Sequence, residues 1–275
     1  MSVDPQGSSP STTPPGSAFV RGTVEAGGYT LDHASAGPDQ PEATIVSLPG
    51  SAGLEMSIAK DRLVARYRVV EINPPGWGGR DDVSTRMHQS ELGPILSSAV
   101  EQLVDGPFYL LGTSMGGSNA LYVAAALPDR VLGIVLEGGM APSRPEDLRM
   151  PPPPEPGAGP EASYPTPATD PRKPWATPEY VAGQMAVRMR MFGWVEPDMR
   201  ASDAIALVRH RNIPVLALLG DEDEILAPTQ EVRFREELPH ADFRLVPTGG
   251  HDLQNTVPQA FVALVDDFIA STAAS

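Results

Sequence analysis

Three residues far apart in the chain, Ser114, Asp223 and His251, are of the types that carry out nucleophilic acyl transfer. A free serine hydroxyl is a poor nucleophile near neutral pH, so it needs an imidazole to take its proton and a carboxylate to orient that imidazole. Each of the three follows a stretch that is expected to be a strand. Because parallel strands end at one edge of a sheet, we expect these side chains to meet there.

The serine lies in the pentapeptide Gly112–Gly116 (GTSMG), between the apolar run Phe108–Leu111 and the alanine-rich stretch Ser118–Leu127. This order predicts a strand, a sharp turn and a helix, and the two glycines remove the β-carbons that would collide at such a turn. The backbone NH of Met115 then lies at a helix N-terminus, where it can stabilise a developing negative charge. We therefore expect Ser114 to be a nucleophile and Met115 to be an oxyanion donor.

The elements around these residues alternate between strands and helices, which predicts an α/β fold with a parallel sheet. Strands are expected at Ala43–Leu48, Arg68–Asn73, Phe108–Leu111, Val131–Leu136, Val215–Leu219 and Phe243–Val246, after a hairpin of Ala18–Thr23 and Tyr29–Ala36. Helices are expected at Met87–Leu103, Ser118–Leu127, Ser202–Arg209, Thr229–Leu238 and Val257–Ala270.

A proline-rich stretch interrupts this alternation in the second half of the chain. Runs such as Pro151–Pro154 can be neither helix nor central strand, so this part of the chain is expected to be extended. A helix is then expected to begin at Thr177, as N-cap, and Pro178. We interpret residues 141–201 as a cap inserted over the carboxyl edge of the sheet, where open α/β sheets bind their ligands.

The rest of the chain divides around this cap. Residues 18–140 and 202–275 are expected to form the α/β core, and residues 1–17, rich in serine, proline and threonine, a disordered tail. Apolar residues of the cap and the nearby loops either pack in the core or line a substrate pocket. The candidates for the pocket are Trp77, Met140, Met185, Phe192 and Trp194.

The composition limits the kind of partner. A formal net charge of −15 argues against binding to nucleic acid or to an anionic membrane surface. With no cysteine, the chain has neither a disulfide nor a thiol nucleophile. The N-terminal segment lacks the features of a signal peptide, and the histidines are too scattered to suggest a metal site. We expect a cytoplasmic protein that acts on a small molecule without metal or organic cofactor; its oligomeric state is left open.

Several motifs occur in an order that resembles the α/β-hydrolase family over nearly the whole chain. The matching stretches are Gly112–Gly116, Pro75–Gly78, Leu127–Val131, Ile213–Leu216, Gly220 with Asp223, and Gly249–His251. The chain order of serine, acid and histidine is also that of this family. The resemblance implies a mostly parallel eight-stranded-type sheet with helices on both faces. It also implies that Ser114 is the nucleophile, His251 the general base and then acid, and Asp223 the group that orients the imidazole.

The sequence departs from the family at the loop expected to supply the second oxyanion donor. Members commonly carry His-Gly there, whereas this chain has Pro49 and Gly50, so the donor NH maps onto Ser51 with an altered support for the loop. The acid also has alternatives. Asp221 is the second choice, and Glu137 is the third because some members take their acid from the end of that earlier strand.

The function implied by this resemblance is that of a serine hydrolase. A carboxylic ester or thioester of a small to medium apolar acyl compound is the expected substrate, cleaved through an acyl-enzyme intermediate. Carbon–carbon bond hydrolases, lactonases and cofactor-free haloperoxidases share the same triad, so the triad does not decide among them. The alternative from another class is a receptor that binds a ligand without turnover.

Overall fold

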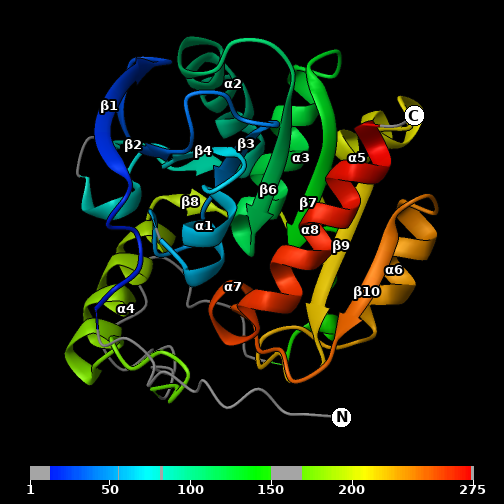
Figure 1. Cartoon of the computed structure of the whole chain (residues 1–275). Coiled ribbons are helices and arrows are strands. Elements are labelled where there is room, and N and C mark those ends of the chain that lie inside the picture. Colours follow the sequence, from blue (N-terminus) through cyan, green and yellow to red (C-terminus); the bar gives the residue numbers. More distant parts are fainter. Residues whose placement is uncertain (1–12, 55, 81–82, 150–168, 274–275) are drawn as a thin grey trace.

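An eight-stranded sheet forms the centre of the computed structural model (Figure 1). The structure describes residues 13–54, 56–80, 83–149 and 169–273. The strands are β1 (Val20–Ala26), β2 (Tyr29–Ala36), β3 (Thr44–Leu48), β4 (Arg68–Ile72), β6 (Phe108–Thr113), β7 (Val131–Glu137), β9 (Val215–Gly220) and β10 (Asp242–Val246). Their order across the sheet is β1-β2-β4-β3-β6-β7-β9-β10. In this sheet β1 pairs antiparallel with β2, and β2 pairs antiparallel with β4, whereas the other neighbouring strands pair parallel. The prediction of a mostly parallel sheet is therefore confirmed.

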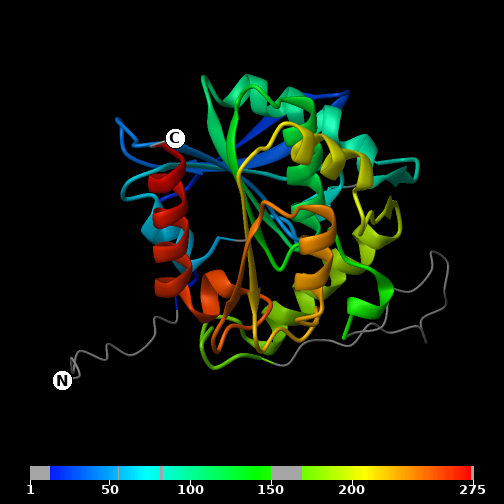
Figure 2. The same cartoon turned by 90° about the vertical axis from the view of Figure 1, so that its right-hand side faces the viewer.

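Helices cover both faces of this sheet (Figure 2). The α-helices of the described residues are α1 (Ile58–Leu63), α2 (Leu92–Leu103), α3 (Met115–Ala126), α4 (Pro178–Phe192), α5 (Ser202–His210), α6 (Gln230–Glu237), α7 (Leu253–Thr256) and α8 (Pro258–Ala273). One apolar layer contains side chains of α2, α3, α5 and α6, and the other contains side chains of α1, α7 and α8. The predicted arrangement of helices on both faces is therefore confirmed.

The central strand β6 shows why its sequence is apolar throughout. Phe108 and Leu110 belong to the first layer, whereas Tyr109 and Leu111 belong to the second. Successive side chains of a strand point to opposite faces, so a strand covered on both sides needs apolar residues at every position. Burial of each such side chain contributes about 1.5–3 kcal/mol to stability, which explains why β6 holds the middle of the sheet.

Three local structures differ from the sequence-based expectations. The helix predicted from Met87 begins only at Leu92, because Met87 and His88 form strand β5 and pair with β8 (Val195–Glu196). The short helices α1 and α7 were not predicted. The start of α1 has a recognisable signal, since the Ser57 hydroxyl accepts the backbone NH of Lys60 as an N-cap.

The segment 141–201 contains the short 3-10 helix η3 (Pro145–Asp147), α4 and β8, and its residues 150–168 lie outside the described residues. Figure 1 shows α4 beyond the edge toward which the parallel strands point. Helix α4 begins as predicted, with the Thr177 hydroxyl accepting the backbone NH of Tyr180 and proline in the first turn. No helix within the described ranges is long and apolar enough to cross a membrane.

Of the tail expected at residues 1–17, residues 1–12 lie outside the described part of the chain. The remainder contacts the core, because the backbone NH of Gly16 donates to both carboxylate oxygens of Asp61 at 3.0 Å.

Candidate active site

Ser114 lies at the sharp turn between β6 and α3. Its backbone has φ 53° and ψ −119°, a conformation that costs energy for a residue with a side chain. The turn is held by backbone hydrogen bonds: the NH of Ser114 donates to Glu137 at 2.9 Å, and its carbonyl accepts from Gly117 at 2.9 Å and Met140 at 3.0 Å. The strain therefore persists because the neighbouring strand and loop fix the turn on both sides.

The glycine of this turn that faces β3 has no room for a side chain. A β-carbon on Gly116 would lie 2.0 Å from the carbonyl oxygen of Leu48, the residue that pairs with Gly112 across β3 and β6. The N-terminus of α3 thus packs directly on the backbone at the end of β3. This contact brings the loop that follows β3 next to the serine.

His251 and Asp223 come from the loops after β10 and β9 and are bonded to each other. The Nδ1 atom of His251 lies 2.9 Å from the Oδ2 atom of Asp223, whose side chain is fully buried. The other carboxylate oxygen of Asp223 accepts the backbone NH groups of Ile225 at 2.7 Å and Leu226 at 2.8 Å. These bonds fix the carboxylate so that it orients the imidazole.

The two alternative acids are placed differently. Asp221 is exposed to solvent, whereas Glu137 is buried and bonded to residues other than His251. Of the three carboxylates considered from the sequence, Asp223 is therefore the one that the structure places on the imidazole.

Asp223 and His251 shift each other's pKa. Burial lowers the pKa of His251, but the charge of Asp223 and the hydrogen bond to it outweigh burial and raise that pKa to about 9. Burial raises the pKa of Asp223, yet the charge of His251 and the hydrogen bonds to the carboxylate bring it below its ordinary value. The charge of Asp223 thus stabilises the protonated form of the His251 imidazole.

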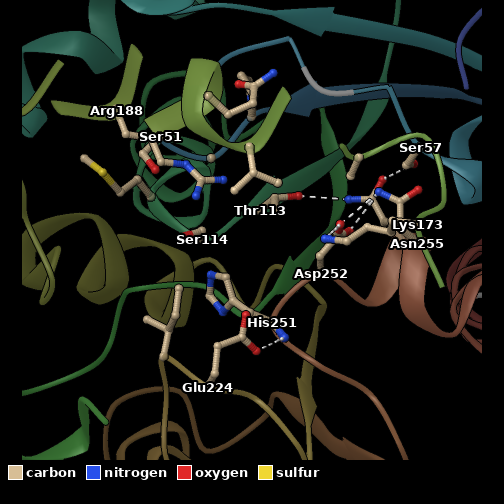
Figure 3. Close-up of a pocket in the computed structure, with 18 of the residues that line it drawn as sticks. Ser51, Ser57, Thr113, Ser114, Lys173, Arg188, Glu224, His251, Asp252 and Asn255 are labelled. Atoms are coloured by element: carbon tan, nitrogen blue, oxygen red, sulfur yellow. Dashed lines mark hydrogen bonds and ion pairs between the residues drawn. The ribbon is translucent and has the colours of Figure 1, made fainter. Parts of the chain in front are cut away.

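The Nε2 atom of His251 is the ring nitrogen that Asp223 does not bind. It is buried and has no hydrogen-bond partner among the described residues, so it makes no hydrogen bond to Ser114 in this state. Figure 3 shows the ring edge of His251 turned toward Ser114, and both residues line one pocket. Catalytic hydrogen bonds are often long before substrate binds and tighten only in the reacting complex.

The loop after β3 lies beside the nucleophile, as expected for the second oxyanion arm. A β-carbon on Gly50 would lie 3.4 Å from the β-carbon of Ser114. Ser51, the next residue, lines the same pocket as Ser114 (Figure 3). Met115, at the start of α3, is also part of the lining. Neither backbone NH has a hydrogen-bond partner within the part of the chain that the structure describes. Both predicted donors are therefore near the serine and available to a ligand.

A buried polar network that the sequence reasoning missed joins the serine turn to the histidine loop. The Glu137 carboxylate accepts the hydroxyl of Thr113 at 2.8 Å and the backbone NH of Gln254 at 2.9 Å, and it also contacts the side-chain amide of Gln254. The Gln254 amide oxygen in turn accepts the hydroxyl of Ser57 at 2.8 Å. Burial raises the pKa of Glu137 to about 7, assisted by the charge of Asp252. The only sequence signal for this role was an acid at a strand end.

The pocket has a volume of about 220 Å³ and lies between the sheet edge and α4. Its apolar wall includes Met140, Leu148, Trp175, Tyr180, Val181 and Phe192. Two predicted pocket residues, Met140 and Phe192, are thus placed in the lining.

The other three predicted pocket residues, Trp77, Met185 and Trp194, are not among the residues that line it. Trp77 is fully buried and contacts Trp194 edge to face, with ring centroids 5.4 Å apart. Met185 is also buried, with 8% of its surface exposed. These side chains pack against protein, because an apolar pattern alone does not distinguish core from pocket.

Charged residues also line the pocket. Lys60 and Glu71, both almost fully buried, form an ion pair there. Lys173 lies 3.1 Å from the carboxylate of Asp252, and the guanidinium of Arg188, from α4, extends into the pocket (Figure 3). Within the described ranges, acidic and histidine side chains form no cluster arranged to hold a metal ion.

The fold and the site define an α/β hydrolase: the sequence profile of the alpha/beta hydrolase family matches residues 45–264, and the chain belongs to that family. The chain is similar to the 2-hydroxy-6-oxononadienedioate/2-hydroxy-6-oxononatrienedioate hydrolase of Escherichia coli (strain K12), with 39% identity over 123 residues. This match covers 42% of the chain and 43% of that enzyme.

Solved structures share the fold at low sequence identity. A putative aryl esterase from Burkholderia cenocepacia superposes with a TM-score of 0.70 at 19% identity, covering 93% of this chain and 100% of that one. A meta-cleavage product hydrolase from Pseudomonas fluorescens IP01 superposes with a TM-score of 0.69 at 17% identity, covering 91% and 97%. A thioesterase domain from the curacin biosynthetic pathway gives 0.63 at 17% identity, covering 91% and 99%. At these identities the similarity shows the fold alone.

Proposed function

We propose that this hydrolase is a serine hydrolase that cleaves a carboxylic ester or thioester of a small to medium apolar acyl compound. The observation that carries the proposal is the hydrogen-bonded pair of Asp223 and His251 in the same pocket as a serine held at a strained turn. The apolar wall supports an apolar acyl group. We also propose that residues 141–201 act as the cap, since α4 supplies part of that wall.

The proposed reaction proceeds through an acyl-enzyme. The Oγ atom of Ser114 attacks the acyl carbon while the Nε2 atom of His251 takes its proton, and the NH groups of Met115 and Ser51 stabilise the oxyanion. The imidazolium then gives the proton to the leaving alcohol or thiol as its bond to the acyl carbon breaks. Water gives a proton to His251 and attacks the acyl carbon of the acyl-enzyme. As the bond from the acyl carbon to the Ser114 oxygen breaks, the imidazolium returns that proton to the serine, and the acid leaves. Asp223 holds the imidazole throughout.

The test is labelling of the intact protein with a fluorophosphonate probe, followed by mass spectrometry, and hydrolysis of p-nitrophenyl esters. We expect the label on Ser114, and no hydrolysis by Ser114→Ala, with a circular dichroism spectrum equal to that of the wild type. A folded wild-type protein that takes no label and turns over no ester, thioester, lactone or carbon–carbon bond substrate would instead be a receptor on this fold.

A carbon–carbon bond hydrolase is the second candidate, and one similarity and one residue favour it. The E. coli relative is named for a dienedioate, a substrate with two carboxylates. In this chain the guanidinium of Arg188 extends into the pocket, where it would bind a carboxylate of such a substrate (Figure 3). We would therefore assay a 2-hydroxy-6-oxo-dienedioate beside the esters.

A pair of variants in α4 separates the two candidates. Arg188→Met should raise the KM for the diacid and leave the KM for a neutral ester almost unchanged. Arg190→Met, two residues along the same helix and exposed, is the matched control. Turnover of the ester alone would assign the chain to the first candidate.

A further inference from the structure

The loop that carries the second oxyanion donor is bonded to a tryptophan from another part of the chain. Trp77, at the start of the 3-10 helix η1 (Trp77–Gly79), donates its indole NH to the carbonyl oxygen of Gly50 at 2.7 Å. The same carbonyl accepts the backbone NH of Gly53 at 3.2 Å. Two donors thus hold one carbonyl, in a loop whose glycines would otherwise leave its backbone free to rotate.

The Gly50 carbonyl and the Ser51 NH belong to a single peptide unit. That peptide is trans, so its C=O and N–H bonds point in opposite directions. Gly50 and Ser51 line the pocket, whereas Trp77 is fully buried and outside the lining. The indole therefore draws the carbonyl away from the pocket, and the NH of Ser51 is directed into it.

The tryptophan itself is held rigidly. Its ring packs edge to face against Trp194 at an interplanar angle of 79°, and its turn approaches the loop backbone so closely that a β-carbon on Gly53 would lie 2.9 Å from the nitrogen of Gly78. A buried indole NH without an acceptor is costly, so the bond to Gly50 stabilises both segments. The contact fixes the orientation of the peptide before substrate arrives, which is what an oxyanion hole requires.

We infer that Trp77 is a positioning residue for the oxyanion hole: its indole NH fixes the Gly50–Ser51 peptide so that the NH of Ser51 faces the reacting carbonyl. The role compensates for Pro49, which has neither a backbone NH nor a polar side chain to support the loop from within. The inference rests on the proposed function, because it assigns the Ser51 NH to the transition state of that reaction.

Trp77→Phe tests this role, since it keeps an aromatic ring and removes the NH. Steady-state hydrolysis of a p-nitrophenyl ester should show kcat lowered on the order of 10- to 100-fold, with KM within a small factor of the wild-type value. The affinity for a boronic acid that mimics the tetrahedral intermediate should fall by a similar factor. If Trp77 had only a structural role, its substitution would not lower the affinity for the boronic acid while leaving KM for the ester nearly unchanged.

Trp194→Phe is the matched control: it removes an indole NH that forms none of the described hydrogen bonds to the oxyanion loop, and it keeps an aromatic ring that can pack against Trp77. Its kcat and analogue affinity should stay close to the wild-type values. If Trp77→Phe does not fold, 3-benzothienylalanine at position 77 replaces the NH by sulfur with the same ring shape, and the same losses are expected.

An unchanged kcat in either folded Trp77 variant, or equal losses in the Trp77 and Trp194 variants, overturns the inference. Failure of the proposed function has a separate result, because the wild-type protein itself would then show no label at Ser114 and no ester hydrolysis.

Discussion

The Glu137 carboxylate binds Gln254 through both the backbone NH and the side-chain amide of that residue. Gln254 lies three positions after His251, at the start of α7, and Glu137 ends the strand that pairs with the strand before Ser114. One buried acid therefore connects the segment that carries His251 to the strand that leads to Ser114. The sheet places the two loops at one edge, and this network sets their separation.

Glu137→Gln should weaken this connection. A glutamine offers one acceptor oxygen where the carboxylate offers two, so a buried donor of Thr113 or Gln254 loses its partner. We expect the free energy of unfolding to fall by about 1–3 kcal/mol and kcat to fall as well. Urea denaturation and ester hydrolysis measure the two effects. Glu222→Gln, at an acid that is 59% exposed, should change neither; equal stabilities for the two variants would contradict the role of the network.

Asp223→Asn should be far more damaging than Asp221→Asn. The first change removes the charge that stabilises the imidazolium and lets the amide favour the wrong tautomer, which in related triads lowers kcat on the order of 10⁴-fold. Asp221 is exposed and does not bond His251, so its variant should keep nearly full activity. Rates with one p-nitrophenyl ester compare the two variants, and the reverse ranking would assign the acid to Asp221.

The rate should depend on pH through His251. The imidazole accepts the serine proton only when it is neutral, and its pKa is raised to about 9 because the charge of Asp223 outweighs burial. Hence kcat/KM should rise with pH and level off only above that pKa. In Asp223→Asn, where burial remains without the charge, the inflection should move to lower pH. A wild-type profile that is already level at pH 6 would contradict the assignment.

Gly116→Ala should disrupt the turn at the nucleophile. Its β-carbon would lie 2.0 Å from the Leu48 carbonyl oxygen, so the backbone of α3 or β3 has to move. We expect a destabilisation of about 1–3 kcal/mol and slower fluorophosphonate labelling of Ser114. Gly183→Ala, in α4 with no atom within 4 Å of the new β-carbon, is the control. Thermal denaturation of both proteins should show loss of stability only in the first.

The buried ion pair of Lys60 and Glu71, which lines the pocket, can be tested by a double-mutant cycle. Lys60→Met leaves the carboxylate of Glu71 buried without its cation, which should destabilise the protein by about 3–5 kcal/mol. Adding Glu71→Leu to the same protein should restore much of that loss, since no charge then remains unpaired. Chemical denaturation of the two single variants and the double variant measures the coupling. Additive losses would contradict a direct interaction.

The sequence was sufficient for the order of the parallel strands along the chain, because most of them are apolar runs with glycine or proline near their ends. The sequence was also sufficient for the turn at Ser114. The glycines two residues before and after the serine lack the β-carbons that would collide where a strand turns sharply into a helix. It missed α1 and α7, since helices of six and four residues carry too few apolar repeats to be recognised.

Three features depended on the tertiary structure. The choice of Asp223 over Asp221 and Glu137 depends on the relative placement of two loops. The division of the predicted pocket residues into pocket lining and protein core depends on the packing of α4. The hydrogen bond from Trp77 to Gly50 joins two segments whose contact no local sequence pattern indicates. Local sequence determines which backbone conformations are accessible, and so the strands, the helices and the serine turn. Which side chain meets which across the sheet edge depends on loops whose geometry is set only when all of them pack together.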